Sequence, residues 1–297
     1  MIQEGHIQTL GGNVFYKIHQ AQNNTSQPPL VIIHGGPGIP HQYLSNLSAL
    51  SQDRPVIFYD QLGCGKSAIK NHDKSLWCGN LALPRFVTEL EDLINFLSQK
   101  LSVQQFDLLG HSWGGSLAIE YALAHPEKIR KLILASPLIS TPLWIENAKK
   151  LINTLPEEAQ QAIQTHELAG TTDSPEYQAA KNLFDTQYLC RITPFPELLM
   201  SSCSQFNFDV YQNMWGPSEF TVTGNLKNFD RWSDLSKINL PTLITCGRFD
   251  EASPELLTQA QKLIKNSELT IFENSAHMPH LEEPENYLKA IQDFLNL

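Results

Sequence analysis

Cysteine is scarce in this chain, which has five cysteines in 297 residues and no C-x-x-C pair. Their odd number and scattered positions argue against a disulfide framework and against a thiolate zinc site. The sequence therefore predicts free thiols, as expected of a protein in a reducing cytoplasm. The five residues are Cys64, Cys78, Cys190, Cys203 and Cys246.

Basic residues are also fewer than acidic residues. The chain has 21 Lys and Arg residues against 31 Asp and Glu residues, a formal net charge of −10 at pH 7. Nucleic acids and anionic membranes are bound through basic surfaces. We therefore expect neither as a partner, and attribute the acidity mainly to solubility.

The chain lacks long apolar runs and paired metal ligands. Residues 1–10 contain Glu4 and His6 and have no basic flank before an apolar stretch, so no signal peptide is expected. No segment reaches membrane-spanning length, and we expect a cytoplasmic protein. Apart from His277 and His280, no histidines are paired at metal-ligand spacing, so neither a metal nor an organic cofactor is implied.

What the chain does contain is an alternation of short apolar runs with amphipathic stretches, which are typical of buried strands and helices. Such alternation predicts an α/β fold, a mostly parallel sheet with helices on both faces. Strands are expected at residues 2–10 and 13–19 (a hairpin), 30–33, 55–59, 106–109, 132–135, 242–246 and 268–272. Helices are expected at residues 83–101, 115–124, 254–264 and 284–295.

The alternation is interrupted between residues 138 and 237. This segment is rich in Gln, Asn, Glu and Pro and has helical periodicity but no convincing buried strand. We interpret it as a helical cap inserted between two strands of the sheet. The predicted domains are a core of residues 1–137 and 238–297 and a cap of residues 138–237.

A nucleophile motif lies at the centre of the predicted core. Residues 110–114 read G-H-S-W-G, between an apolar strand and a helix that ends before Pro126. This strand–turn–helix context is that of a nucleophile elbow, which exposes the serine hydroxyl at the end of its strand. Ser112 is therefore the predicted nucleophile.

A serine nucleophile needs a base and an acid that orients the base. In elbow-containing sheets both follow the serine in chain order, beyond later strands. Asp250 and His277 occupy such positions. Asp234 precedes its strand and is the weaker acid candidate, whereas His280 lies in the same loop as His277 and stays open as the base.

The oxyanion of the tetrahedral intermediate needs two N–H donors. One is the amide of Trp113, the residue after the nucleophile. The other is expected in the loop H-G-G-P-G at residues 34–38, from Gly36 or, failing that, from Gly35.

A second glycine-rich segment ends in G-C-G-K-S at residues 63–67, like a phosphate-binding loop. The pattern G-x-x-x-x-G-K-[ST] requires a glycine at position 60, which is Asp60. Nucleotide binding is therefore not expected.

The three motifs together resemble those of the proline iminopeptidases of the α/β-hydrolase superfamily, nearly end to end. The resemblance implies an α/β-hydrolase fold. The segment at residues 59–67 departs from the family's usual D-Q-R-G-x-G-x-S, because Leu62 stands where arginine is common.

The resemblance extends into the cap, where G-P-S-E-F at residues 216–220 matches the family's G-P-x-E-F. It implies that Glu219, with Glu251 as its companion, binds the free α-amino group of the substrate. A buried ammonium needs such a compensating charge. For the proline ring we expect a small apolar pocket walled by aromatic residues such as Trp113, Trp215 or Phe220.

The leading hypothesis is thus a serine aminopeptidase that removes N-terminal proline, or another small residue, from short peptides or amino-acid amides. The alternative is the same triad acting as an amidase, esterase or lactonase. Epoxide hydrolysis and dehalogenation are disfavoured because those relatives carry aspartate at the elbow. A non-catalytic binding module is disfavoured because all triad candidates are present.

Overall fold

The computed structural model describes residues 1–23, 27–67 and 81–297, so that Cys78 lies outside the described residues. Eight strands form one sheet in the order β1-β2-β4-β3-β5-β6-β7-β8. They are β1 (Ile2–Thr9), β2 (Gly12–His19), β3 (Leu30–Ile33), β4 (Val56–Tyr59), β5 (Phe106–His111), β6 (Ile129–Ala135), β7 (Thr242–Gly247) and β8 (Ser267–Phe272).

The sheet is mostly parallel, as the sequence predicts. β1 and β2 form the expected hairpin, and β2 pairs antiparallel with β4. The remaining neighbours, from β4 through β3, β5, β6 and β7 to β8, are all parallel. Their carboxyl ends therefore meet at one edge, and the loops after β3, β5, β7 and β8 are brought together there.

Helices cover both faces of the sheet. In β3, Val31 and Ile33 pack with α1 (Leu83–Leu101), α2 (Trp113–Ala124) and α8 (Pro254–Leu263). Leu30 and Ile32 pack on the other side with η1 (His41–Gln52) and α10 (Pro284–Asn296). Among the helices of the described ranges, none has the length and apolar character needed to cross a membrane.

One element of the core, the 3₁₀ helix η1, is absent from the sequence-based assignment. Its buried leucines Leu44, Leu47 and Leu50 recur every three residues, the period of a 3₁₀ helix rather than that of an α-helix. That spacing is the signal that could have identified it.

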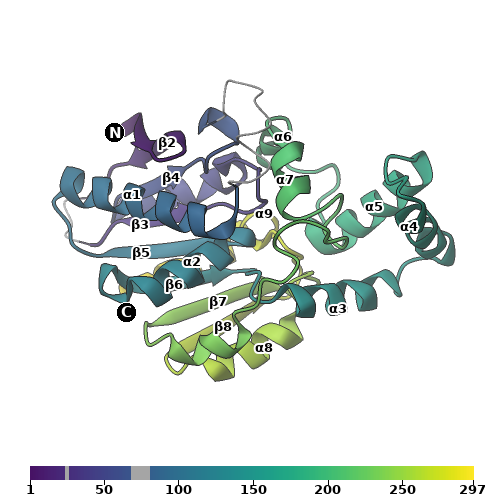
Figure 1. Cartoon of the computed structure of the whole chain (residues 1–297). Helices are drawn as coiled ribbons and strands as arrows, with labels where there is room; N and C mark the ends of the chain where they lie inside the picture. Colours follow the sequence, from purple (N-terminus) through teal and green to yellow (C-terminus); the bar gives the residue numbers. More distant parts are fainter. Residues whose placement is uncertain (24–26, 68–80) are drawn as a thin grey trace.

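Helices fill the chain between β6 and β7. They are α3 (Thr141–Ile152), α4 (Glu157–Ala169), α5 (Pro175–Phe184), the π-helix η5 (Asp185–Leu189), α6 (Glu197–Cys203), α7 (Phe208–Met214) and the 3₁₀ helix η6 (Trp232–Lys237). Figure 1 shows α3, α4 and α5 extending to one side of the sheet, at the right of the view. Tyr177, Phe184 and Phe220 belong to a separate apolar cluster there. The assignment of residues 138–237 to a distinct domain stays a prediction.

Candidate active site

Ser112 lies between β5 and α2 in a strained backbone conformation, with φ 55° and ψ −122°. Its N–H donates to Ala135 O at 2.9 Å, which ties the turn to the end of β6. A Cβ on Gly110 would lie 2.2 Å from Gly114 O, so only glycine fits where strand and helix approach. These features are those of a nucleophile elbow.

Asp250 and His277 meet beyond the ends of β7 and β8. His277 Nδ1 lies 2.7 Å from Asp250 Oδ1, and both side chains are buried. Ala252 N–H donates to the same Oδ1 at 2.8 Å, while Gly247 N–H donates to Oδ2 at 3.3 Å. A carboxylate held in this way keeps the proton on Nδ1 and leaves Nε2 free to accept one.

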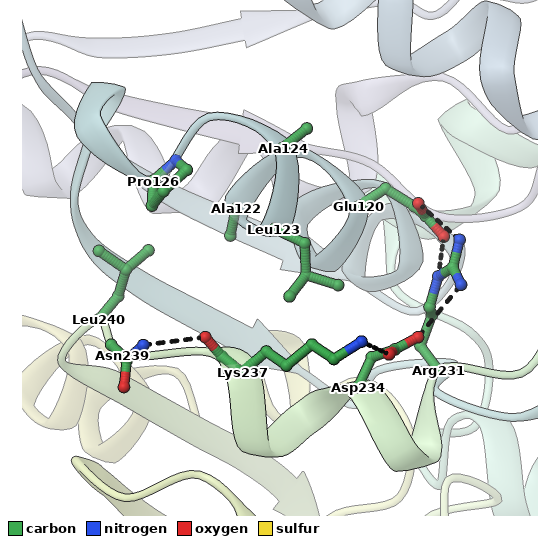
Figure 2. A pocket seen from close by; sticks show the side chains of 10 residues that line it. All are labelled: Glu120, Ala122, Leu123, Ala124, Pro126, Arg231, Asp234, Lys237, Asn239 and Leu240. Atoms are coloured by element: carbon green, nitrogen blue, oxygen red, sulfur yellow. Dashed lines mark hydrogen bonds and ion pairs between the residues drawn. The ribbon is translucent and has the colours of Figure 1, made fainter.

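The two rival residues lie elsewhere. Asp234 bonds to Arg231 at 3.1 Å and to Lys237 at 2.6 Å in a surface groove beside α2 and η6, as Figure 2 shows. His280 is buried, and its Nε2 bonds to Tyr43 O at 3.2 Å. Burial lowers the pKa of His280 to about 3. Neither residue is among those that line the cavity containing Ser112.

The loop after β3 lies against the elbow, because a Cβ on Gly35 would be 3.0 Å from Ser112 Cβ. Gly35 N–H already donates to Tyr43 Oη at 2.7 Å, which leaves Gly36 as the oxyanion candidate. His34 Nδ1 lies 2.9 Å from Gly35 O. Because a trans peptide directs its C=O and N–H oppositely, Gly36 N–H points away from His34.

Gly36 has φ +103°, a conformation that favours glycine, and it lines the cavity with Ser112. Trp113 opens α2, so its N–H is among the helix amides that have no intrahelical acceptor. Both predicted oxyanion donors are therefore next to Ser112 in space or in sequence, and their role stays a prediction.

A cavity of about 380 Å³ contains Ser112, His277 and Glu219. This volume is typical of small-molecule sites, which run from roughly 300 to 1,000 Å³. Its apolar walls include Tyr43, Leu189, Phe195, Leu199, Phe206, Tyr211 and Met278.

The expected aromatic walls do not line this cavity. Trp113 is buried, and its Nε1 donates to Gln61 Oε1 at 2.8 Å. Trp215 Nε1 donates to Ser218 O at 3.0 Å, and Phe220 packs in the cap cluster. Sequence reasoning chose these aromatics for their closeness to motifs. The apolar walls instead come from α6, α7, η1 and η5 and from the loop residues Phe195, Phe206 and Met278.

Glu219 and Glu251 converge on the same region from the cap and the core. Glu219 lines the cavity. Glu251 is not among the lining residues, but its Oε1 lies 3.9 Å from His277 Nε2. Glu251 is 1% exposed, and neither carboxylate oxygen has a hydrogen-bond partner among the described residues.

Both glutamates have perturbed acidity. Burial raises the pKa of Glu219, and the charge of Asp185 adds to this effect. Burial also raises the pKa of Glu251 well above its ordinary value, with the charge of Glu219 as the next cause. A cation between them would relieve both the burial cost and the mutual repulsion.

Helix α3 holds both glutamates through their backbones. Trp144 Nε1 donates to Glu219 O at 3.1 Å, and Asn147 Nδ2 donates to Glu251 O at 3.0 Å. The Trp144 ring also stands edge-on to His277, with centroids 5.8 Å apart. These positions were not singled out from the sequence, because nothing local marks them.

An ion pair at the cavity wall was also missed. Lys181 Nζ lies 2.5 Å from Asp185 Oδ2, and both residues line the cavity. Asp185 Oδ1 has no hydrogen-bond partner among the described residues. The i,i+4 spacing on a helix was the available signal.

Comparison with known proteins matches residues 28–284 to the alpha/beta hydrolase fold. The chain is 45% identical over 297 residues to the proline iminopeptidase of Heyndrickxia coagulans, covering 100% of this chain and 99% of the relative. It is 37% identical to the proline iminopeptidase of Saccharolobus solfataricus, covering 99% of this chain and 93% of the relative.

Solved structures agree with the sequence relatives. The crystal structure of VinJ superposes with a TM-score of 0.90 at 32% identity, over 99% of this chain and 98% of that one. The proline iminopeptidase of Mycobacterium smegmatis superposes with a TM-score of 0.88 at 30% identity, over the same shares. The predicted fold and resemblance are thus confirmed, and the chain belongs to the α/β-hydrolase fold family and, within it, to the proline iminopeptidases.

Proposed function

We propose that this protein is a serine aminopeptidase that releases proline from the free N-terminus of short peptides. The observation that carries the proposal is the buried Glu251 carboxyl, which lies 3.9 Å from His277 Nε2 and has no hydrogen-bond partner among the described residues. Together with Glu219 it forms a site for a cation beside the predicted nucleophile. The ring nitrogen of an N-terminal proline is such a cation.

In the proposed mechanism, Ser112 Oγ attacks the carbonyl carbon of the N-terminal residue while His277 Nε2 takes the hydroxyl proton. The amides of Gly36 and Trp113 stabilise the resulting oxyanion. The intermediate collapses as His277 gives the proton to the leaving amine, and an acyl-enzyme remains. Water then attacks it, and His277 takes the water's proton and returns it to Ser112 Oγ as free proline leaves.

Glu219 and Glu251 restrict this chemistry to the first residue of a peptide. When the N-terminal ammonium is bound between them, the carbonyl of that same residue lies at the nucleophile. An acylated nitrogen carries no charge and would not be bound there. The proposed cytoplasmic location rests on the sequence, whose cysteines are odd in number and scattered.

The first test compares four substrates: proline β-naphthylamide, its N-acetylated form, alanine β-naphthylamide and a p-nitrophenyl ester. We expect rapid cleavage of the free proline amide and loss of cleavage on acetylation. Ester cleavage with no preference for a free amine would reject the ammonium site and leave an esterase with the same triad.

The second test replaces Glu219 by Gln. Losing a charge-assisted bond to a buried cation costs about 1.5–3 kcal/mol, so we expect kcat/KM for the proline amide to fall roughly 10- to 100-fold. Ester hydrolysis should stay within about twofold of wild type. The matched control is Glu176→Gln, which changes an exposed glutamate at the start of α5. Equal losses on amide and ester would remove the ammonium-binding role from Glu219.

A further inference from the structure

Two buried side chains that the mechanism does not use, Tyr43 and His111, join three parts of the site. Tyr43 Oη lies 2.7 Å from Gly35 N and 2.8 Å from His111 Nδ1. His111 Nε2 lies 3.0 Å from His277 O. The rings pack as well, with centroids 5.3 Å apart for Tyr43 and His111 and 4.9 Å apart for His111 and His277.

The direction of each hydrogen bond follows from the chemistry of the groups. The carbonyl of His277 can only accept, so His111 carries its proton on Nε2. Burial holds the pKa of His111 well below its ordinary value, so the ring is neutral and Nδ1 accepts. Tyr43 must therefore donate its proton to His111 Nδ1, and its oxygen accepts from Gly35 N–H.

The bonds thus form one chain, from Gly35 N–H through Tyr43 and His111 to His277 C=O. Gly35 directly precedes Gly36, the oxyanion candidate, and His111 directly precedes Ser112, the predicted nucleophile. His277, at the other end of this chain of bonds, is the predicted base. We propose that Tyr43 and His111 are positioning residues that hold the oxyanion loop, the elbow and the histidine loop in register. The proposal rests on the proposed serine mechanism.

Asp250 positions a different part of His277 from the one held by this chain of hydrogen bonds. The carboxylate fixes the His277 ring through Nδ1, whereas His111 fixes the His277 backbone. Without the Tyr43 hydroxyl, Gly35 N–H and His111 Nδ1 both lose a buried partner, and the loop bearing Gly36 can shift relative to Ser112. Misplacement of reacting groups by about 1 Å costs on the order of 10²-fold in rate.

The test uses Tyr43→Phe, which removes only the hydroxyl. We expect kcat for proline β-naphthylamide to fall by roughly 10²-fold, with KM within about twofold, because the ammonium site is untouched. Phosphonylation of Ser112 by a fluorophosphonate should slow by a similar factor. The labelled fraction at completion should equal that of wild type, since the protein stays folded.

Tyr287→Phe is the matched control, because Tyr287 is as buried as Tyr43 but lies outside the chain of hydrogen bonds. Its ring packs against that of His280, with centroids 5.9 Å apart. Its kcat should stay near wild type. The proposal would be overturned if Tyr43→Phe and Tyr287→Phe lowered kcat equally. It would also be overturned if kcat of Tyr43→Phe stayed within threefold of wild type.

His111→Gln and the double variant provide an independent check. Because one break interrupts the whole chain, the double variant should be no slower than the slower single variant. Additive losses would mean that the two residues act separately, against the proposal. If wild type reacts with the fluorophosphonate but leaves the proline amide intact, the proposed substrate is wrong, and the labelling rates still decide the positioning role.

Discussion

Ser112 has a backbone conformation that residues with a side chain rarely adopt, with φ 55° and ψ −122°. The surrounding fold imposes it, through the Ser112 N–H bond to Ala135 O and the close contact of Gly110 with Gly114. The hydroxyl itself is not needed for that geometry. The nucleophile can therefore be removed without loss of the elbow.

Ser112→Ala should abolish turnover, lowering kcat on the order of 10⁶-fold, as expected when a serine nucleophile is lost. The melting temperature should stay within about 2 °C of wild type, because alanine can adopt the same turn. Steady-state kinetics on proline β-naphthylamide and a thermal melt measure both. Retained activity in this variant would exclude Ser112 as the nucleophile.

Glu89 is a second residue whose surroundings determine its chemistry. Its two oxygens accept from Leu62 N–H at 3.2 and 3.1 Å, and the side chain is buried on α1. Burial raises the pKa of Glu89 to about 8. Position 62 is where the family usually has arginine, and leucine supplies no cation to this carboxyl.

A buried acid with a raised pKa destabilises the fold as pH rises. Below pH 4 both folded and unfolded chains hold the Glu89 proton; between about 4.5 and 8 only the folded chain holds it, so stability falls across this window. At neutral pH the loss is about 3 kcal/mol. Glu89→Gln should flatten the decline in unfolding free energy between pH 5 and 8, as measured by urea denaturation.

Glu158→Gln is the control for Glu89, since Glu158 is an exposed glutamate in the first turn of α4. Its stability should follow the wild-type curve. If the Glu89→Gln curve also runs parallel to wild type, Glu89 is not the group that couples folding to pH.

At the scale of elements, α3 links the cap to the predicted ammonium site. It presents Trp144 and Asn147 one turn apart, and each donates to the backbone of one glutamate. One helix thereby anchors the backbones of two glutamates that come from different parts of the chain. The geometry of the site depends on α3 rather than on Glu219 and Glu251 alone.

Asn147→Ala removes the donor to Glu251 O and should raise KM for the proline amide about fivefold, the effect of one buried hydrogen bond of about 1 kcal/mol. The p-nitrophenyl ester, which has no ammonium, should be hydrolysed at the wild-type rate. Glu146→Ala changes an exposed neighbour on the same helix and should alter neither substrate. A KM increase for ester and amide together would indicate a general disturbance of the cavity.

At the scale of the whole molecule, β5 connects the active site to the end of the chain. Asp107 near its start accepts from Arg130 at 2.9 and 2.6 Å and from Arg54 at 2.8 Å. The same arginines bond to Leu295 O at 3.0 Å and to Asn296 Oδ1 at 2.8 Å. This network attaches the final helix at the opposite end of β5 from Ser112.

Asp107→Asn leaves two guanidinium groups without their buried counter-charge, a loss of about 3–5 kcal/mol. The melting temperature should fall by about 5–8 °C. At 25 °C kcat and KM should stay near wild type, because Ser112 lies at the other end of the strand. Lys289→Ala, which breaks an exposed pair on α10, should not change the melting temperature. A loss of activity without a loss of stability would contradict this separation.

Periodicity and motif context in the sequence sufficed for the strands and for α1, α2, α8 and α10 of the core, though not for η1. They also sufficed for the elbow and for the positions of Asp250 and His277 beyond the ends of β7 and β8. These features are local, or follow from the rule that parallel strands end at one edge of the sheet. The mostly parallel sheet with helices on both faces is the observed fold. The boundaries agree within a few residues because apolar runs and proline or glycine punctuation mark them.

Only the tertiary structure decided which of the candidate groups face one another. Tyr43 and His111 are 68 residues apart, and His111 and His277 are 166 residues apart, so no local pattern could pair them. The same holds for Gly35, whose N–H is taken by Tyr43, and for the cavity walls. The sequence by itself determined which elements form and which reactive groups they carry. Packing between distant segments determined which N–H donors are already taken and which carboxyls lie buried with no hydrogen-bond partner in the described part of the chain.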